Sequence, residues 1–194
     1  MKRYAVIPTG NREADYLNVI AWCKAHHFTT VTIATSPEAY DYSVGKVIVN
    51  NQLNISRWWN IGLDYIAEKM FANDEEYIVA ILNDDVILQD DWTEKLEPYI
   101  VQGNSGASGQ RWGTKEKISG YAFLLNGRHD MRFDEKFVWY CGDDDMYQQC
   151  LTEGGFAIVK GLVVENKYAR SSESLFSGQI EKDFTSYREK WSTS

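Results

Sequence analysis

The stretch Tyr77-Ile78-Val79-Ala80-Ile81-Leu82, followed by Asn83-Asp84-Asp85-Val86, decides how this chain is organised. Six mostly apolar residues in a row, several of them β-branched, predict a buried central strand. The polar residues 83–85 then fall at its carboxyl end, where ligands bind in open α/β sheets. Two adjacent carboxylates there need a cation or several hydrogen-bond donors to be buried. By itself the stretch fits a metal that holds a diphosphate as well as it fits a polar turn.

Composition narrows the class of protein. The chain has 194 residues, of which 44% are hydrophobic, and this suits one domain with a normal core. A net charge of -8 and a pI of about 4.9 argue against a general binder of nucleic acid, although a local basic patch would escape this count. No window approaches the ~18 apolar residues of a membrane span, and no signal-peptide pattern follows Met1. Cys23, Cys141 and Cys150 lack zinc spacing and cannot all pair, so we expect free thiols in a cytoplasmic protein.

Periodicity predicts alternating strands and helices. The predicted strands are residues 4–7, 31–35, 46–49, 77–82, 118–125 and 156–164. The predicted helices are residues 13–27, 57–71 and 143–153, one from a cap at 90–92 to about residue 100, and an amphipathic stretch at 180–191. Residues 103–109, rich in Gly and Ser, are predicted as a loop or short edge strand, and 133–137 as a turn. This alternation favours a three-layer α/β sandwich.

Several short motifs follow one another between residues 4 and 166. Residues 6–12 join a strand to a polar loop, residues 57–62 read Arg-Trp-Trp-Asn-Ile-Gly, and residues 77–86 join a strand to an acidic loop. Gly120, the turn at 133–137 and the run at 142–146 come next. In this order they resemble the nucleotide loop, the R/A-x-x-N-x-G helix start, the DxD motif and the ED-x-D helix of family 2 glycosyltransferases. The resemblance implies the GT-A fold, an α/β/α sandwich around a mostly parallel mixed central sheet.

The chain departs from the family pattern in three places. Asn83 stands at the first position of DxD, and Gly142 stands where the family has the Glu of ED. After the last strand the family often has a metal-binding His, and here that place holds Glu165 and Asn166.

A donor site for a nucleotide-diphosphate sugar follows from the resemblance. Its predicted residues are Pro8, Thr9, Asn11, Arg12, Arg57, Asn60, Asn83, Asp84 and Asp85. In the loop after the first strand, the Thr and Asn side chains are expected to bind ribose or base and Arg12 to bind phosphate. The alternative is that this loop is an ordinary turn with a surface Arg. Asn60 serves either the donor or the backbone of a loop, and Asp84 either orients the ribose or holds its own loop. Asp85 is the predicted ligand of Mn²⁺ or Mg²⁺, with Glu165 as the next candidate.

The second acidic cluster supplies the candidate catalytic residues. Asp143, Asp144 and Asp145 are expected to open a helix, where acids also serve as ordinary caps. Their mutual repulsion is expected to raise one pKa toward that of a useful base. The family register implies Asp143 as the general base, with Asp144 as its rival, and hence inversion at the anomeric carbon. Gly120, Trp139 and Tyr140 are the predicted acceptor-binding residues, although each aromatic side chain equally suits a core.

Three functions remain open at this point. The first is an inverting glycosyltransferase, and the second is a non-catalytic nucleotide-sugar or glycan-binding module. The third, a nucleotidyltransferase, would normally carry a longer basic glycine-rich loop after the first strand. We expect one catalytic domain over residues 1–166, with residues 167–194 as a polar extension packed on it. The acceptor class is left open among glycan, protein, lipid and modified DNA base, and a second subunit of a homo-oligomer is one way to complete its site.

Overall fold

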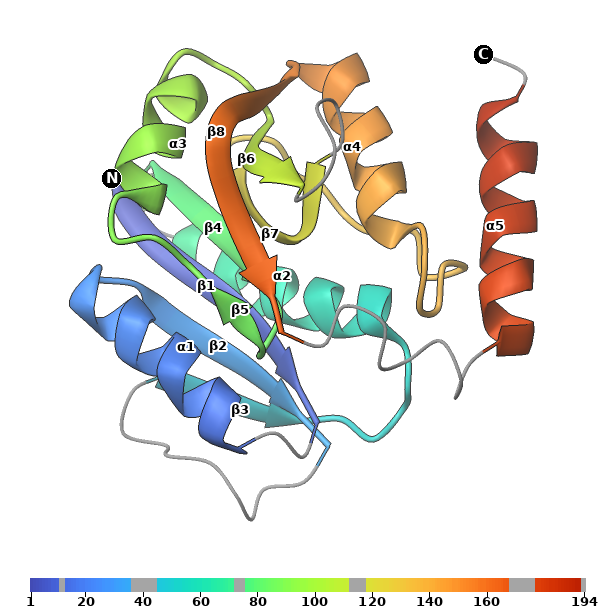
Figure 1. Ribbon diagram of the computed structural model, residues 1–194, viewed down its shortest axis with the longest axis horizontal. Helices are drawn as coiled ribbons and strands as arrows, with labels where there is room; N and C mark the ends of the chain where they lie inside the picture. The colour runs from blue at the N-terminus through green and yellow to red at the C-terminus, as the bar shows by residue number, and fades with distance from the viewer. Residues whose placement is uncertain (11–12, 36–44, 72–75, 112–117, 168–176, 193–194) are drawn as a thin grey trace.

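The computed structural model describes residues 1–10, 13–35, 45–71, 76–111, 118–167 and 177–192, and within these it has eight strands and five helices. In chain order they are β1 (Lys2–Thr9), α1 (Glu13–Ala25), β2 (Thr29–Ala34), β3 (Gly45–Val49), α2 (Ile55–Phe71), β4 (Tyr77–Leu82), β5 (Val86–Ile87), α3 (Trp92–Val101), β6 (Gly106–Arg111), β7 (Ile118–Asn126), α4 (Gly142–Glu153), β8 (Phe156–Asn166) and α5 (Ser177–Trp191). Strands and helices alternate along much of the chain (Figure 1). None of the described helices is both long and apolar enough to cross a membrane.

One mixed sheet carries the fold, with the strand order β3-β2-β1-β4-β7-β6-β8-β5. Strands β3, β2, β1 and β4 are parallel neighbours, so their carboxyl ends meet at one edge. β7 runs antiparallel to β4 and β6, β8 is parallel to β6, and β5 pairs antiparallel with β8. β4 lies inside the sheet with residues 78–82 buried, which confirms the central strand predicted from its apolar run.

Helices cover both faces of the sheet (Figure 1). On one face α1 and α3 pack against the strands, and Trp92 of α3 shares an apolar cluster with Leu82 of β4. On the other face α2 and α4 do so, and Trp59 and Met146 share a second cluster with Ile81. Neighbouring residues of β4 feed opposite clusters because successive side chains of a strand point to opposite faces. The predicted α/β/α sandwich is therefore confirmed.

The prediction for residues 103–109 was correct for the loop at 103–105 but wrong for 106–109, because these belong to β6, which is neither a loop nor an edge strand. β6 lies between β7 and β8, with both of its sides paired. Its small residues reflect close neighbours: a Cβ added at Gly106 would come within 2.6 Å of the Phe156 ring, and one at Gly109 would overlap the Leu162 carbonyl. Composition suggested a turn here, whereas tight packing inside the sheet is what requires the glycines.

Helix α2 begins at Ile55, earlier than the start predicted at Arg57. Asn54 caps it, since its side-chain Oδ1 accepts a hydrogen bond from the Arg57 backbone N–H at 3.0 Å. The same amide donates through Nδ2 to the Glu135 carbonyl at 2.9 Å. The start of α2 is thus tied to the turn near residue 135, which lies far away in the sequence.

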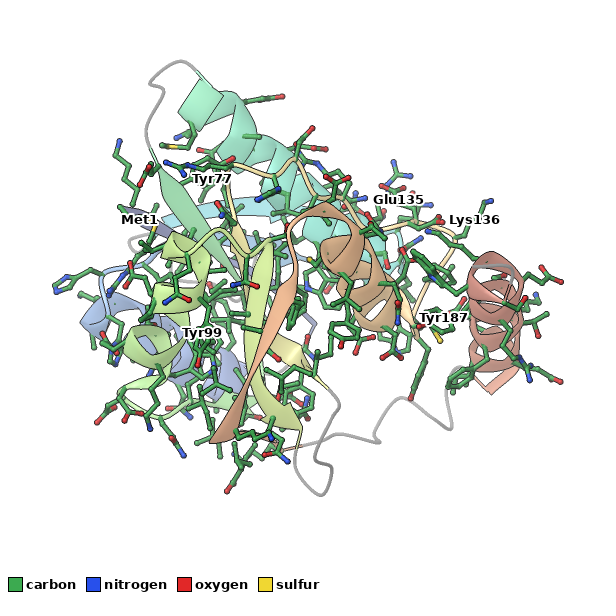
Figure 2. All side chains as sticks on the ribbon, turned by 90° about the horizontal axis from the view of Figure 1, so that it is seen from above. Met1, Tyr77, Tyr99, Glu135, Lys136 and Tyr187 are labelled. Atoms are coloured by element: carbon green, nitrogen blue, oxygen red, sulfur yellow. The ribbon has the colours of Figure 1, made fainter. Side chains whose placement is uncertain are left out.

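Helix α5 lies beside α4 and the segment at 133–140, away from the sheet (Figures 1 and 2). Seen from above, the turn with Glu135 and Lys136 lies between α2 and α5, and Tyr187 lies on the side of α5 that faces α4 (Figure 2). The Tyr187 ring centroid is 6.2 Å from that of Phe137. Phe184, by contrast, is 45% exposed, so α5 buries only part of its apolar surface.

The contact between α2 and β1 gives a test of the packing. Gly62→Ala adds a methyl group that would overlap the buried Val6 side chain. We expect the free energy of unfolding to fall by about 1–3 kcal/mol, measured by denaturant titration, because a packed core has no room for extra volume. Gly178→Ala in α5 is the control, since an added Cβ there meets open space and should change stability by at most about 1 kcal/mol in the stabilising direction. Equal losses in both variants would contradict the packing explanation.

Candidate functional site

The loops after β1 and β4 meet at the carboxyl edge of the sheet. The two strands are parallel neighbours, with Val6 paired to Ile81. Thr9, at the end of β1, donates its hydroxyl to Asp84 Oδ2 at 2.8 Å, and the Gly10 N–H approaches the same oxygen at 3.4 Å. Both Thr9 and Asp84 are buried. Of the two roles considered for Asp84, the observed contact is the one that holds the loop.

Asp85 is fixed by the end of β8. Its carbonyl oxygen accepts the Lys167 N–H at 3.2 Å, and the following strand β5 pairs with Glu165 and Asn166. The Asp85 side chain is buried, whereas Glu165 is exposed. The described residues contain no group of three His, Cys, Asp or Glu placed to hold a metal ion. One buried carboxylate still suits Mg²⁺ or Mn²⁺, because such ions are often held by one or two carboxylates together with substrate phosphates.

Asp143 lies directly over the backbone of β7. It belongs to the first turn of α4, which begins at Gly142. A Cβ added at Gly120 of β7 would overlap the Asp143 carboxylate and lie 2.8 Å from the Asp143 Cβ. Gly120 therefore leaves the space that this carboxylate occupies. Its predicted contact with an acceptor stays a prediction.

The two acidic segments converge on one strand. Tyr121, the residue after Gly120, accepts the Asn83 backbone N–H through its carbonyl at 2.9 Å. Asp143 thus contacts β7 at Gly120, and the next residue of that strand, Tyr121, is hydrogen-bonded to Asn83 at the start of the loop of residues 83–85. The structure brings the predicted base and the predicted donor loop to the same part of the sheet edge. The two segments lie far apart in the sequence, so their spacing along the chain did not by itself require them to be close in space.

The turn into α4 is sterically confined. Cys141 has a φ of 64°, a left-handed conformation that costs a residue with a side chain about 1–2 kcal/mol. At Gly142 an added Cβ would come within 2.6 Å of Ser56 Oγ in α2. Burial, with the negative charge of Asp144 and Asp143, raises the pKa of the Cys141 thiol to about 12. The thiol stays protonated at neutral pH and is a poor nucleophile.

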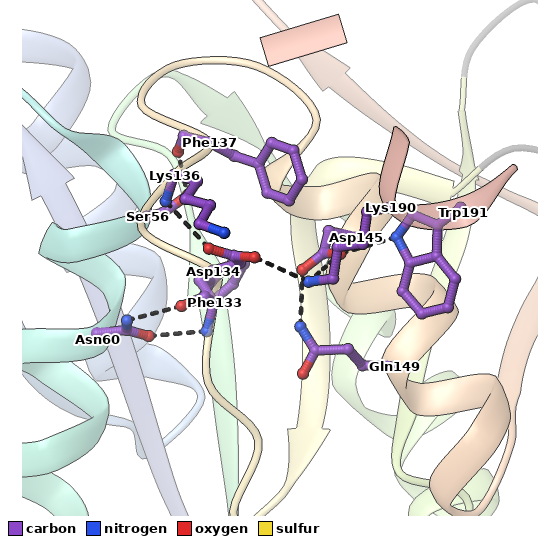
Figure 3. Close-up of polar contacts among 10 residues, drawn as sticks. All are labelled: Ser56, Asn60, Phe133, Asp134, Lys136, Phe137, Asp145, Gln149, Lys190 and Trp191. Atoms are coloured by element: carbon purple, nitrogen blue, oxygen red, sulfur yellow. Dashed lines mark hydrogen bonds and ion pairs between the residues drawn. The ribbon is translucent and has the colours of Figure 1, made fainter. Parts of the chain in front are cut away.

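The three adjacent aspartates have different surroundings. Asp145 is fully buried, and its carboxylate accepts hydrogen bonds from Gln149 Nε2, Trp191 Nε1 and Lys190 Nζ, each at 2.8 Å (Figure 3). Burial and the nearby charge of Asp144 raise the pKa of the Tyr187 phenol in α5. Asp145 is therefore paired with α5, Asp144 acts electrostatically on α5, and Asp143 lies against β7. The expected repulsion among all three stays a prediction, and at Asp145 the structure places the Lys190 ammonium group beside the carboxylate.

Lys190 joins Asp145 to Asp134, with Nζ 3.0 Å from Asp134 Oδ2 (Figure 3). Burial by itself would lower the pKa of Lys190, but hydrogen bonds to the two carboxylates outweigh it and the net pKa is raised. Burial would likewise raise the pKa of Asp134, yet its bonds from Lys190 and from the Lys136 N–H hold that pKa below its usual value. The raised pKa of Lys190 and the lowered pKa of Asp134 both favour the charged forms of this ion pair.

Asn60 and Arg57 lie near the start of α2. The Asn60 amide donates to the Phe133 carbonyl at 2.9 Å and accepts the Phe133 N–H at 2.8 Å (Figure 3). Of its two predicted roles, support of a loop backbone is the one observed. Arg57 has a 43% exposed side chain that lies 3.8 Å from Glu135 Oε2, which leaves much of its guanidinium accessible.

The remaining predicted residues fall into three groups. Pro8 is buried in β1, paired with Ile33 of β2. Trp139 and Tyr140 are partly buried: the Trp139 ring packs edge-on against Trp58 at 6.4 Å, and the Tyr140 ring lies 6.2 Å from Phe184. Asn11 and Arg12 lie outside the described residues. Sequence reasoning missed Asp183, Lys190 and Trp191, for which the amphipathic pattern of residues 180–191 was the one available signal.

Comparison with known proteins defines the fold and leaves the family open. No protein-family model matches the chain, and no curated protein matches it. Among solved structures, mannosyl-3-phosphoglycerate synthase from Rubrobacter xylanophilus has a TM-score of 0.59 at 10% identity, over 100% of this chain and 76% of that one. A putative glucose-1-phosphate thymidylyltransferase from Bacillus anthracis has a TM-score of 0.55 at 9% identity, over 93% and 95%. A glycosyltransferase involved in glycosylation of the major capsid of PBCV-1 has 0.53 at 11% identity, over 95% and 98%.

At these identities the likeness concerns the fold. The chain has the architecture of glycosyl- and nucleotidyltransferases of the GT-A type, as the motif order implied. Membership of family 2 in particular stays a prediction.

The overlap at Gly120 can be measured as a coupling. Gly120→Ala should destabilise the wild-type protein, because the new methyl group displaces the Asp143 carboxylate. In an Asp143→Ala background part of the overlap is absent, so the same substitution should cost less. A double-mutant cycle by denaturant titration should give an interaction energy of about 0.5–3 kcal/mol. Additive effects would show that the two residues are not in contact.

Proposed function

We propose that the protein is a glycosyltransferase that moves a sugar from a nucleotide-diphosphate donor to an acceptor hydroxyl with inversion. The observation that carries the proposal is the Asp143 carboxylate, held against Gly120 beside the loop of Asn83, Asp84 and Asp85. A general base and a diphosphate site must lie on opposite sides of the anomeric carbon, and this edge of the sheet has a candidate for each. The transferase fold agrees with this use of the edge.

Donor binding is assigned to the loops after β1 and β4 and to the start of α2. The hydrogen bond from Thr9 to Asp84 joins the two loops and holds in place the surface on which the nucleotide would bind. Arg57 has an accessible guanidinium suited to phosphate. Asp85 would hold Mn²⁺ or Mg²⁺, which neutralises the charge that develops on the departing diphosphate. Glu165 is the alternative ligand, and Asn60 acts by holding the loop at Phe133.

Asp143 is assigned the role of base. It lies in the first turn of α4, at the electropositive amino end of the helix, where an acidic side chain is well placed. It takes the proton from the acceptor hydroxyl as that oxygen forms a bond to the anomeric carbon. The bond from this carbon to the diphosphate breaks at the same time, so the nucleoside diphosphate leaves from the opposite face. Trp139, partly buried before α4, is the candidate surface for an acceptor sugar.

The nucleotidyltransferase alternative shares this fold. The products separate the two reactions, because glycosyl transfer or donor hydrolysis releases a nucleoside diphosphate whereas nucleotidyl transfer releases pyrophosphate. A screen of nucleotide sugars and nucleoside triphosphates with sugar phosphates should therefore be read for both products.

Donor binding gives the first functional prediction. A nucleoside diphosphate with Mn²⁺ should raise the thermal unfolding temperature, since a hundredfold excess over Kd stabilises the folded state by about 2.7 kcal/mol. Asp85→Ala should remove the metal-dependent part of this shift. Asp90→Ala is the control, because the Asp90 side chain is fully exposed and lies outside the proposed site. The absence of a shift with any common nucleotide, with or without metal, would contradict the donor site.

The general base gives the second. Asp143→Asn keeps the shape that fits above Gly120 but cannot accept the proton, so turnover should fall by about 10²–10⁴-fold with donor affinity nearly unchanged. Initial-rate kinetics and donor titration measure the two quantities. Asp144→Asn is the matched variant and should retain most activity. A loss at Asp144 in place of Asp143 would move the base by one residue, and two silent variants in an active enzyme would leave the acids as a helix cap.

A further inference from the structure

A buried carboxylate of α5 binds the backbone that leads into α4. Asp183 is fully buried, and its Oδ2 accepts the N–H groups of Trp139 and Tyr140, both at 2.8 Å. Its Oδ1 accepts the Val138 N–H at 3.3 Å and Gln179 Nε2 at 2.7 Å. All four donors are amide N–H groups, and their hydrogen bonds compensate the burial of this polar side chain.

The bound segment leads directly to the proposed base. Tyr140 is followed by Cys141 in its left-handed conformation, by the confined Gly142, and then by Asp143. Three consecutive N–H groups held by one carboxylate fix the direction in which the backbone enters this turn. A shift of the segment would therefore be passed to Asp143, which has little free space above Gly120.

A second anchor lies near the carboxyl end of α5, and here the donors belong to α5 and the acid does not. There the acid is Asp145 of α4, and the donors are Lys190 and Trp191 of α5 (Figure 3). Asp183 and Lys190 are seven residues apart, nearly two helical turns, so both lie on one face of α5. The two anchors hold α5 at two points along its length, whereas Phe184, which lies between them in the sequence, is 45% exposed.

We propose that Asp183 is a positioning residue for the transfer reaction. It holds the segment at 138–140 so that the Asp143 carboxylate lies at the distance from the bound donor that proton transfer from the acceptor hydroxyl requires. This inference rests on the proposed function. It assigns a catalytic consequence to α5, although none of the residues involved in this anchor belongs to the donor site.

The test compares Asp183→Asn with Glu189→Gln. The first keeps the size of the side chain but turns an –NH₂ group toward backbone donors, and the second removes one charge from an exposed position of the same helix. Asp183→Asn should lower kcat by about 10- to 100-fold with an unchanged KM for the donor, the usual effect of misplacing a reacting group by about 1 Å. Glu189→Gln should leave both constants unchanged.

An Asp143→Asn background separates positioning from a general loss of structure. If Asp183 acts through Asp143, then Asp183→Asn should lower kcat no further in that background, because residues that act as a unit are not additive. An equal loss of kcat in both backgrounds, or no loss in either, would overturn the proposal.

Amide hydrogen exchange tests the anchor without any activity. In Asp183→Asn the N–H groups of Val138, Trp139 and Tyr140 and the first turn of α4 should exchange about tenfold faster or more, with strand β4 unchanged. Faster exchange confined to α5 would overturn the proposal. If wild type transfers no sugar, the proposed function fails, while this exchange result still decides whether Asp183 orders the turn. Should Asp183→Asn not fold, Gln179→Ala removes one of the four bonds and should give a smaller change at the same amides.

Discussion

The bare backbone of β7 at Gly120 is the constraint on which the site depends. No side chain fits between that strand and Asp143, so α4 brings its first turn directly against the sheet. The next carbonyl along β7, that of Tyr121, binds the N–H of Asn83 and connects the same strand to the donor loop. A single strand therefore sets the relation between the candidate base and the candidate diphosphate site, and rigid elements of this kind hold reacting groups better than free loops do.

Several aspartates around this site stabilise the structure, in addition to the one that is proposed as the base. Asp84 accepts a hydrogen bond from the end of β1, Asp145 accepts one from α5, and Asp183 accepts one from the backbone before α4. Each of these carboxylates is buried and hydrogen-bonded, whereas Asp143 lies partly exposed at the edge. Burial with several donors fixes a carboxylate in place, while a catalytic base must remain accessible to a hydroxyl. The difference in exposure is what separates the candidate base from its supporting acids.

The sequence by itself determined the layers of the fold and the order of its motifs. The apolar run of β4 identified a central strand because burial on both faces requires apolar side chains throughout, and the predicted strand and its observed bounds agree. Alternating strand and helix patterns gave the α/β/α sandwich, because periodicity is a local property of the chain. Local chemistry also placed Asp143 in the first turn of α4, where acids favour the end of a helix.

Tertiary structure alone decided which of these groups meet. The small residues of β6 looked like a loop, and only its two neighbours in the sheet explain them. The adjacency of Asp143, Asp144 and Asp145 suggested one cluster, yet α5 draws Asp145 into a network with Lys190, some 45 residues later in the chain. Asp183 gave no signal of its own, because one acid in an amphipathic helix is ordinary until the fold brings backbone donors to it. Contacts between residues far apart in the sequence leave no local pattern, and the path of the chain decides them.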